Sequence, residues 1–97
     1  MKLRWDQRAL GDLRDIRNYI SAHSTPASAE RVRAYLVGRV DRLRAHTRLG
    51  TASSDAEIRI LAPTRYPYRI YYTVQRGEVV ILHVRHTARQ APPDLQP

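Results

Sequence analysis

The 97-residue chain has no cysteine, and its apolar residues never form a long uninterrupted run. Without cysteine, neither disulfide bonds nor zinc sites with thiolate ligands can support the fold. No apolar run approaches the roughly 18 residues that a membrane-spanning helix needs, and residues 1–10 lack the apolar segment of a signal peptide. We therefore expect one small domain in the reducing environment of the cytoplasm.

The sequence motifs of several large enzyme classes are also absent. The chain has no glycine-rich phosphate loop, no GxSxG nucleophile turn, no HExxH zinc helix and no GxGxxG dinucleotide turn. His83 and His86 are three residues apart in a predicted strand, so they should point to opposite faces and not share a metal ion. We expect neither a metal site nor a cofactor.

Negative charge is scarce, because 9 acidic residues face 17 basic ones and the net charge is +8. Sixteen of the 17 basic residues are arginine, a side chain suited to bidentate contacts with phosphate and carboxylate groups. Such a positive field attracts nucleic acid or an acidic protein partner. Charge alone does not separate these partners, and codon usage in a GC-rich genome is an alternative cause of the preference for arginine over lysine.

Hydrophobic periodicity predicts two amphipathic helices followed by three strands. Apolar residues at helical spacing run over residues 5–20 and 29–43. Asp6 and Thr25 should cap the two helices, and the second helix should extend to about Arg48. Residues that are β-branched, aromatic or alternately apolar indicate the strands, one of which precedes the first helix. The expected strands are residues 2–5, 57–61, 68–75 and 78–84.

The predicted order of elements, β-α-α-β-β-β, indicates an α+β fold. The two helices should form a hairpin that buries both apolar stripes against one face of a mostly antiparallel, twisted sheet. We expect a domain over residues 1–90 and a flexible C-terminal tail over residues 91–97.

The last two strands should form a tight hairpin, because glycine stands in the two-residue turn 76–77. A regular ladder that starts from this turn pairs Ile70 with His83 and Arg69 with Val84. A shift of one residue would move every side chain beyond it to the other face, so all later face assignments depend on this register.

In this register His86 emerges on the face that carries Arg69, and Arg59 of the neighbouring strand can join them. The candidate binding residues are Arg59, Arg65, Arg69, His86 and Arg89. Such a face could bind phosphate groups, or stabilise a phosphate undergoing transfer with histidine as acid or base. The alternative is an ordinary solvent-exposed sheet face whose arginines aid solubility. The other histidines of this region, His46 and His83, are expected to be structural or solvated.

Four segments of the chain match a known family in order. They are ALxDLxxIxxYI at residues 9–20, EIRIL at 57–61, YRIYYTV at 68–74 and VVILHVRHTAR at 79–89. With the predicted order of elements, they make the chain resemble the RelE/ParE toxin superfamily of bacterial type II toxin–antitoxin systems. The resemblance implies a small cytoplasmic toxin that a cognate, typically acidic antitoxin neutralises by folding on its surface. The resulting toxin–antitoxin hetero-oligomer would repress its own operon.

The branch of the superfamily decides the mechanism. RelE-like members cleave messenger RNA on the ribosome, and by resemblance the catalytic residues would be Arg59, Arg69 and His86. No tyrosine follows Tyr72, so the aromatic residue that such ribonucleases carry near the C-terminus is missing. The ending HTAR is more similar to ParE-like members, which lack the ribonuclease residues and are associated with poisoning DNA gyrase. We favour a non-enzymatic ParE-like toxin, with a RelE-like ribonuclease and a non-toxic nucleic-acid-binding module as alternatives.

Overall fold

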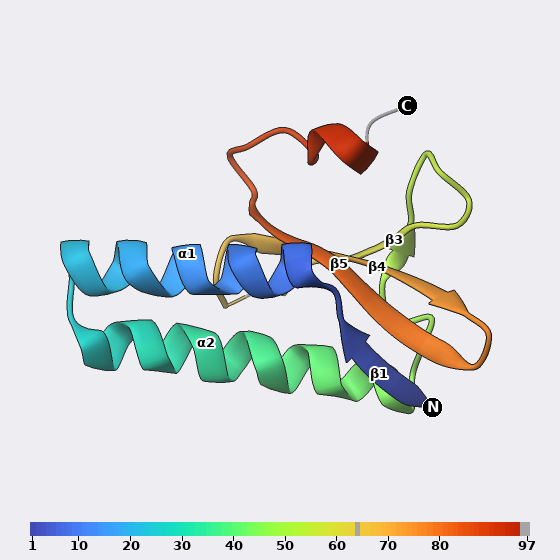
Figure 1. Cartoon of the computed structure of the whole chain (residues 1–97), viewed down its shortest axis with the longest axis horizontal. Helices are drawn as coiled ribbons and strands as arrows, with labels where there is room; N and C mark the ends of the chain where they lie inside the picture. The colour runs from blue at the N-terminus through green and yellow to red at the C-terminus, as the bar shows by residue number, and fades with distance from the viewer. Residues whose placement is uncertain (64, 96–97) are drawn as a thin grey trace.

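The computed structural model describes residues 1–63 and 65–95. Two long helices lie side by side and antiparallel, next to a five-stranded sheet in the order β1-β5-β4-β3-β2 (Figure 1). The elements are β1 (Lys2–Trp5), α1 (Gln7–His23), α2 (Pro26–Asp41), the 3-10 turn η1 (Arg42–Arg44), β2 (Thr51–Ala52), β3 (Arg59–Leu61), β4 (Tyr68–Gln75), β5 (Glu78–His86) and the 3-10 turn η2 (Pro93–Leu95).

The sheet is mostly antiparallel, because β1 runs parallel to β5 and every other neighbouring pair is antiparallel. This arrangement confirms the expected α+β fold, with a helical hairpin on one face of the sheet. The short strand β2 is not among the strands that the sequence predicted. In the two described ranges, no helix is long and apolar enough to cross a membrane.

Both helices begin at the predicted caps. Asp6 Oδ2 accepts a hydrogen bond from the backbone N–H of Arg8 at 3.0 Å. Thr25 Oγ1 accepts one from the backbone N–H of Ser28, also at 3.0 Å. These bonds satisfy N–H groups that the first turn of a helix leaves without a partner.

The second helix ends at Asp41, so the expectation of a helix to about Arg48 is wrong. The chain tightens into η1, which keeps Leu43 in the core. Tyr72 Oη then donates a hydrogen bond to the carbonyl of Thr47 at 2.8 Å. This bond holds the segment after η1 against the sheet, so the segment does not extend α2.

The helix-facing side of the sheet carries the main hydrophobic core. The fully or nearly buried residues of this core are Ala9, Val32, Leu36, Val40, Leu43, Leu61, Ile70, Tyr72, Val79, Ile81 and Val84. The opposite side, which we call the outer face, carries a second and smaller apolar cluster. The buried residues of this outer-face cluster are Ile58, Tyr71, Val80 and Leu82.

A β-bulge in β5 changes the predicted pairing of the last hairpin. The predicted pairs are observed from the turn up to Tyr72 and Ile81. The next pair is Tyr71 with His83, which leaves Leu82 as an extra residue in β5. Every residue of β5 beyond the bulge therefore changes face relative to a regular ladder.

The pairs predicted beyond the bulge are wrong. Ile70 pairs with Val84 instead of His83, and Arg69 pairs with Arg85 instead of Val84. A regular ladder would have placed His83 under the helices. The extra residue moves His83 away from the main core and brings Val84 into it.

The C-terminal residues 91–95 lie on the outer face, on the side of β5 away from α2 (Figure 1). Ala91 and Leu95 pack against the outer-face cluster, and Pro92 is fully buried. Residues 96–97 of the expected flexible tail lie outside the described residues. The flexibility of the tail stays a prediction, although residues 91–95 have defined contacts.

Candidate functional site

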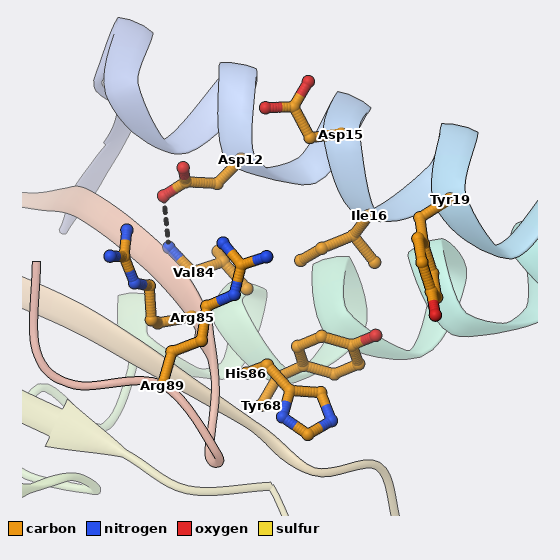
Figure 2. A pocket seen from close by; sticks show the side chains of 9 residues that line it. All are labelled: Asp12, Asp15, Ile16, Tyr19, Tyr68, Val84, Arg85, His86 and Arg89. Carbon is orange, nitrogen blue, oxygen red and sulfur yellow. Dashed lines mark hydrogen bonds between the residues drawn. The ribbon is translucent and has the colours of Figure 1, made fainter.

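An open groove of about 500 Å³ runs between α1 and the C-terminal end of β5. The residues that line this α1–β5 groove are Asp12, Asp15, Ile16, Tyr19, Tyr68, Val84, Arg85, His86 and Arg89 (Figure 2). On one wall α1 supplies two carboxylates and an aromatic ring, and on the other wall β5 and the turn after it supply three basic side chains. The groove therefore offers positive, negative and aromatic groups to a partner.

Asp12 sets the distance between the two walls of the groove. Its Oδ2 accepts a hydrogen bond from the backbone N–H of Val84 at 3.0 Å (Figure 2). Because β1 pairs with β5 only up to Ile81, the backbone of β5 beyond that residue is free to bond with a side chain of α1. The bond to Asp12 takes the place of a strand partner and docks α1 on β5.

Tyr68 and His86 form the aromatic end of the groove. They pair across β4 and β5, and their rings meet edge to face with centroids 5.4 Å apart. Burial, with a smaller effect of Tyr19, raises the pKa of the Tyr68 hydroxyl, which therefore stays neutral at neutral pH. Tyr19 at the rim is 64% exposed and stacks on His23, with ring centroids 4.1 Å apart. This aromatic surface can pack against an apolar or ring-shaped group of a partner.

Arg85 and Arg89 are the uncommitted cations of the groove. In the part of the chain that the structure describes, neither guanidinium has a carboxylate at ion-pair distance. Within the same residues, Nε of Arg85 is buried and has no hydrogen-bond partner. A buried donor without a partner costs free energy, so an acceptor oxygen that reaches Arg85 would be stabilised there.

Of the five predicted binding residues, the structure brings His86 and Arg89 into the groove. Nδ1 of His86 accepts a hydrogen bond from the backbone N–H of Ala88 at 3.0 Å, which orients the ring at the start of the following turn. Arg85 joins these two residues, although the sequence did not single it out as a site residue.

Sequence reasoning also missed the α1 wall of the groove. Asp12, Asp15 and Tyr19 are spaced by three and four residues, which puts them on one side of a helix. That spacing could have grouped them, whereas their approach to β5 depends on how the helix docks on the sheet.

Two of the predicted residues lie elsewhere. Arg59 is on the helix-facing side of the sheet, opposite Tyr72, and its Nη2 donates to the carbonyl of Gly50 at 2.5 Å. This side chain therefore holds the segment after η1. Arg65 is exposed before β4, with its guanidinium carbon 5.9 Å from the ring centre of Tyr66.

The expectation that Arg69 and His86 share a face is wrong. Arg69 lies on the outer face, where its Nη1 donates to the carbonyl of Thr87 at 3.2 Å. His86 pairs with Tyr68, which packs against the helix-facing core. The extra residue in β5 is the physical cause, because it reverses the face of each residue beyond it.

His83 does not have a free ring nitrogen. One nitrogen faces Asp12 and the other faces Asp94, so His83 is not available as a general base, in line with the structural role expected of it. Among residues 1–63 and 65–95, no group of three histidine or acidic side chains is placed to hold a metal ion.

Three comparisons with known proteins agree on the RelE/ParE superfamily. A family model described as "ParE toxin of type II toxin-antitoxin system, parDE" matches residues 3–91. The chain is 39% identical over 86 residues to a protein named Toxin RelE2 from Caulobacter vibrioides, and the match covers 88% of this chain and 93% of that protein. A solved chain of the chromosomal ParDE TA system from P. aeruginosa has a TM-score of 0.81 at 25% identity, and the match covers 89% of this chain and 95% of that one. The chain belongs to the ParE toxin family and is the toxin component of a type II toxin–antitoxin system, which implies an antitoxin as its partner.

Proposed function

We propose that this toxin acts by binding DNA gyrase and not by cleaving messenger RNA. The observation that supports this mechanism is the separation of Arg59, Arg69 and His86. Cleavage of RNA through its 2′-hydroxyl needs cations and an acid–base group that converge on one phosphate. Here Arg69 lies on the outer face, His86 lies on the helix-facing side, and Arg59 is bonded to a backbone carbonyl.

The charges of the α1–β5 groove also favour a protein partner over RNA. Asp12 and Asp15 stand on the wall opposite Arg85 and Arg89 (Figure 2). A phosphodiester held by the arginines would lie near these carboxylates, and like charges at short range repel each other. A protein segment can offer carboxylates to the arginines and N–H or hydroxyl donors to the opposite wall.

We assign the groove to the antitoxin. An acidic segment is attracted by the net charge of +8, and its carboxylates can form bidentate pairs with Arg85 and Arg89. An apolar residue beside such a carboxylate would pack on Tyr19 and Ile16, which line the same groove. A cytoplasmic location of the toxin is part of the proposal, and DNA gyrase as the proposed target supports it.

A supercoiling assay with purified gyrase and an increasing molar excess of the full chain tests the proposed target. We expect supercoiling to be lost and to return when the cognate antitoxin is added. A DNA-damage reporter should respond when the toxin is expressed alone. Unchanged supercoiling at high excess, together with a silent reporter, would reject gyrase as the target.

Ribosome-dependent cleavage of messenger RNA is the second candidate, because Arg85, His86 and Arg89 meet in one groove. Primer extension on translated messenger RNA separates the two mechanisms. We expect no new codon-specific 5′ ends after toxin induction. New ends that disappear in a His86→Ala variant would show that the groove cleaves RNA.

Growth arrest on expression without the antitoxin is expected under both of these mechanisms. Its absence, combined with nucleic-acid binding that weakens steeply with salt, would identify a non-toxic binding module instead.

A further inference from the structure

His83 lies in β5 with its ring held between two carboxylates. Its Nδ1 is 2.7 Å from Oδ2 of Asp12 in α1. Its Nε2 is 3.0 and 3.1 Å from the two carboxylate oxygens of Asp94 in the C-terminal segment. The His83 side chain is only 10% exposed, so these contacts are largely protected from water. Through this ring, α1, β5 and the C-terminal segment meet.

The protonation state of the His83 ring determines how many hydrogen bonds it can donate. A neutral imidazole has one N–H donor, whereas an imidazolium has two. Asp12 Oδ2 also accepts from the backbone N–H of Val84, and Asp94 Oδ2 also accepts from Arg8 at 2.5 Å. Each carboxylate therefore already accepts one hydrogen bond besides its contact with the ring. An imidazolium can donate to both carboxylates at once, whereas a neutral ring can donate to only one of them.

The charge of Asp94 is supported by its neighbours. Burial by itself would raise the pKa of the Asp94 carboxyl, but the hydrogen bonds from His83 and Arg8 outweigh burial and lower this pKa. The hydrogen bond with Asp6 is the main reason why the pKa of Arg8 is raised. Asp94 thus remains a carboxylate, and Arg8 a cation, at any pH near neutrality.

Asp94 is the charged attachment of the C-terminal segment, residues 91–95. The apolar side of the same segment is formed by Ala91 and Leu95, which cover the outer-face cluster. Segments near a chain terminus are ordered only where such contacts tie them down. The docking of this segment should therefore respond to the contact between His83 and Asp94, which acts together with the ion pair between Arg8 and Asp94.

We propose that His83 is a pH-sensitive clasp, which fastens residues 91–95 over the outer face while its ring is protonated and loosens them when the ring loses a proton. A neutral ring has a single donor, so one of the two carboxylates must lose its bond. Asp94 is the one released, because its side chain is 40% exposed and belongs to a short terminal segment. Asp12 is retained, because it is part of α1 and also holds the N–H of Val84.

The direction of the switch follows from the groups that surround the ring. The neighbouring charged or titratable groups are Asp12 and Arg8 of α1, Asp94 of the C-terminal segment, Arg85 of β5 and Tyr71 of β4. Carboxylates and guanidinium groups ordinarily keep their charge between about pH 5.5 and 8.5, and phenols ordinarily stay neutral there, whereas histidine ordinarily changes charge in this interval. The clasp should therefore be closed on the acidic side of the interval and loosened on the basic side.

Nuclear magnetic resonance of the full chain tests the clasp with two readouts. The nitrogen chemical shifts of the His83 ring report whether one or both nitrogens carry a proton. The methyl shifts of Leu95, which packs on the outer-face cluster, report how far the segment is docked. Between about pH 5.5 and 8.5, we expect the ring to lose one proton and the ratio of docked to free segment to fall about tenfold.

Variants separate the clasp from a general effect of pH. In His83→Gln and in Asp94→Asn, the segment should be loose at about pH 5.5 and insensitive to pH. Asp41→Asn, which alters a carboxylate paired with Arg44 at the end of α2, should behave like the wild type. The methyl shifts of Ile70 in the main core check that each variant is folded.

Asp94→Asn changes a partly exposed side chain and keeps the test decisive if His83→Gln does not fold. Three results would overturn the clasp: a neutral His83 ring at about pH 5.5, a docked population that does not respond to pH in the wild type, or an Asp94→Asn segment that stays docked.

Discussion

At the level of single residues, the hydroxyl of Tyr72 connects the end of the helical hairpin to the sheet. The ring is fully buried, and its Oη donates to the carbonyl of Thr47 at 2.8 Å and accepts from the N–H of Gly50 at 2.9 Å. A Cβ atom on Gly50 would lie 2.7 Å from the Tyr72 ring. Glycine is therefore needed here because the backbone and the ring approach each other so closely.

Tyr72→Phe should lower the free energy of unfolding by about 1–3 kcal/mol, because two backbone groups lose their hydrogen-bond partner. Urea denaturation, followed by the fluorescence of the single tryptophan, Trp5, which packs against the core, measures the change. Tyr19→Phe is the matched control, since its hydroxyl belongs to an exposed ring and its removal should have little effect. A loss in Tyr72→Phe no larger than in this control would contradict the proposed role.

Residue-level predictions succeeded where the interacting groups are close in sequence. Asp6 and Thr25 bond to backbone groups two and three residues further on, so their capping roles follow from local chemistry. Gly50 lies well beyond the end of α2 at Asp41, although the sequence predicted a helix to about Arg48. Its structural requirement comes from Tyr72, 22 residues away, and no local pattern contains that information.

At the level of elements, the β4–β5 hairpin shows a turn that the sequence predicted correctly. Arg76 and Gly77 occupy the turn with φ of 52° and 75°. Two successive positive φ angles are the mark of the turn type that matches the twist of two-residue hairpins. Glycine adopts this conformation without strain, whereas arginine does not.

Arg76→Asn should therefore raise the free energy of unfolding by up to about 1 kcal/mol, because asparagine tolerates positive φ better than arginine. Gly77→Ala should lower the free energy of unfolding by about 1 kcal/mol, because alanine tolerates positive φ less well than glycine. Gly38→Ala in α2 is the matched control: a Cβ there meets no atom within 4 Å, and alanine favours the helix by up to about 1 kcal/mol. Thermal denaturation of the three variants should show these signs, and equal effects at both glycines would refute the turn argument.

The same hairpin contains the feature that the sequence did not reveal. The sequence pattern identified two long strands and the turn between them. A regular ladder from this turn would pair His83 with Ile70 and point its ring into the main core. A histidine there would lack a polar partner, which is costly. The bulge at Leu82 resolves this conflict by placing His83 next to Asp12, a residue 71 positions away. The misplaced polar residue was a hint of the bulge, and the location of its partner depended on the docking of α1.

At the level of the whole molecule, the sequence identified an excess of positive charge but not the place where it becomes useful. The side chains of Arg59 and Arg69 donate hydrogen bonds to backbone carbonyls. The two arginines of the α1–β5 groove, Arg85 and Arg89, lie where α1 crosses the end of β5. A groove between two elements depends on packing over long sequence separations, so only its separate walls could be predicted.

Arg89→Glu should weaken binding of the cognate antitoxin about tenfold, because it replaces an attractive charge in the groove by a repulsive one. Arg76→Glu changes the net charge by the same amount at the distant hairpin turn (Figure 1). Arg76→Glu should therefore lose only the part of the antitoxin affinity that comes from the overall charge of the toxin. Titration calorimetry at two salt concentrations measures both effects. If the two variants lost affinity equally, the groove would not be the contact surface.

Stability at low pH also concerns the whole molecule, because acid acts on folding and on net charge together. Hydrogen bonds with the side chain and backbone of Arg8 lower the pKa of Asp6 below its ordinary value, against the effect of burial. The pKa of Asp94 is lowered as well. A carboxyl with a lowered folded-state pKa contributes stability that is fully present above its unfolded-state pKa and is lost as the pH falls through the folded-state value.

Urea denaturation should therefore show a free energy of unfolding that does not fall from about pH 7 down to about pH 5 and decreases below about pH 4. Protonation of the 9 acidic residues adds to a net charge that is already +8, and the resulting repulsion acts in the same direction. Asp6→Asn keeps a side chain that can cap α1 but loses the ion pair with Arg8, so it should be less stable at about pH 7 and show a smaller decrease below about pH 4. Asp15→Asn, which changes an exposed carboxyl of the same helix, should keep the full decrease. If Asp6→Asn and Asp15→Asn lost stability in parallel with the wild type, the Asp6–Arg8 pair would not be a source of the acid sensitivity.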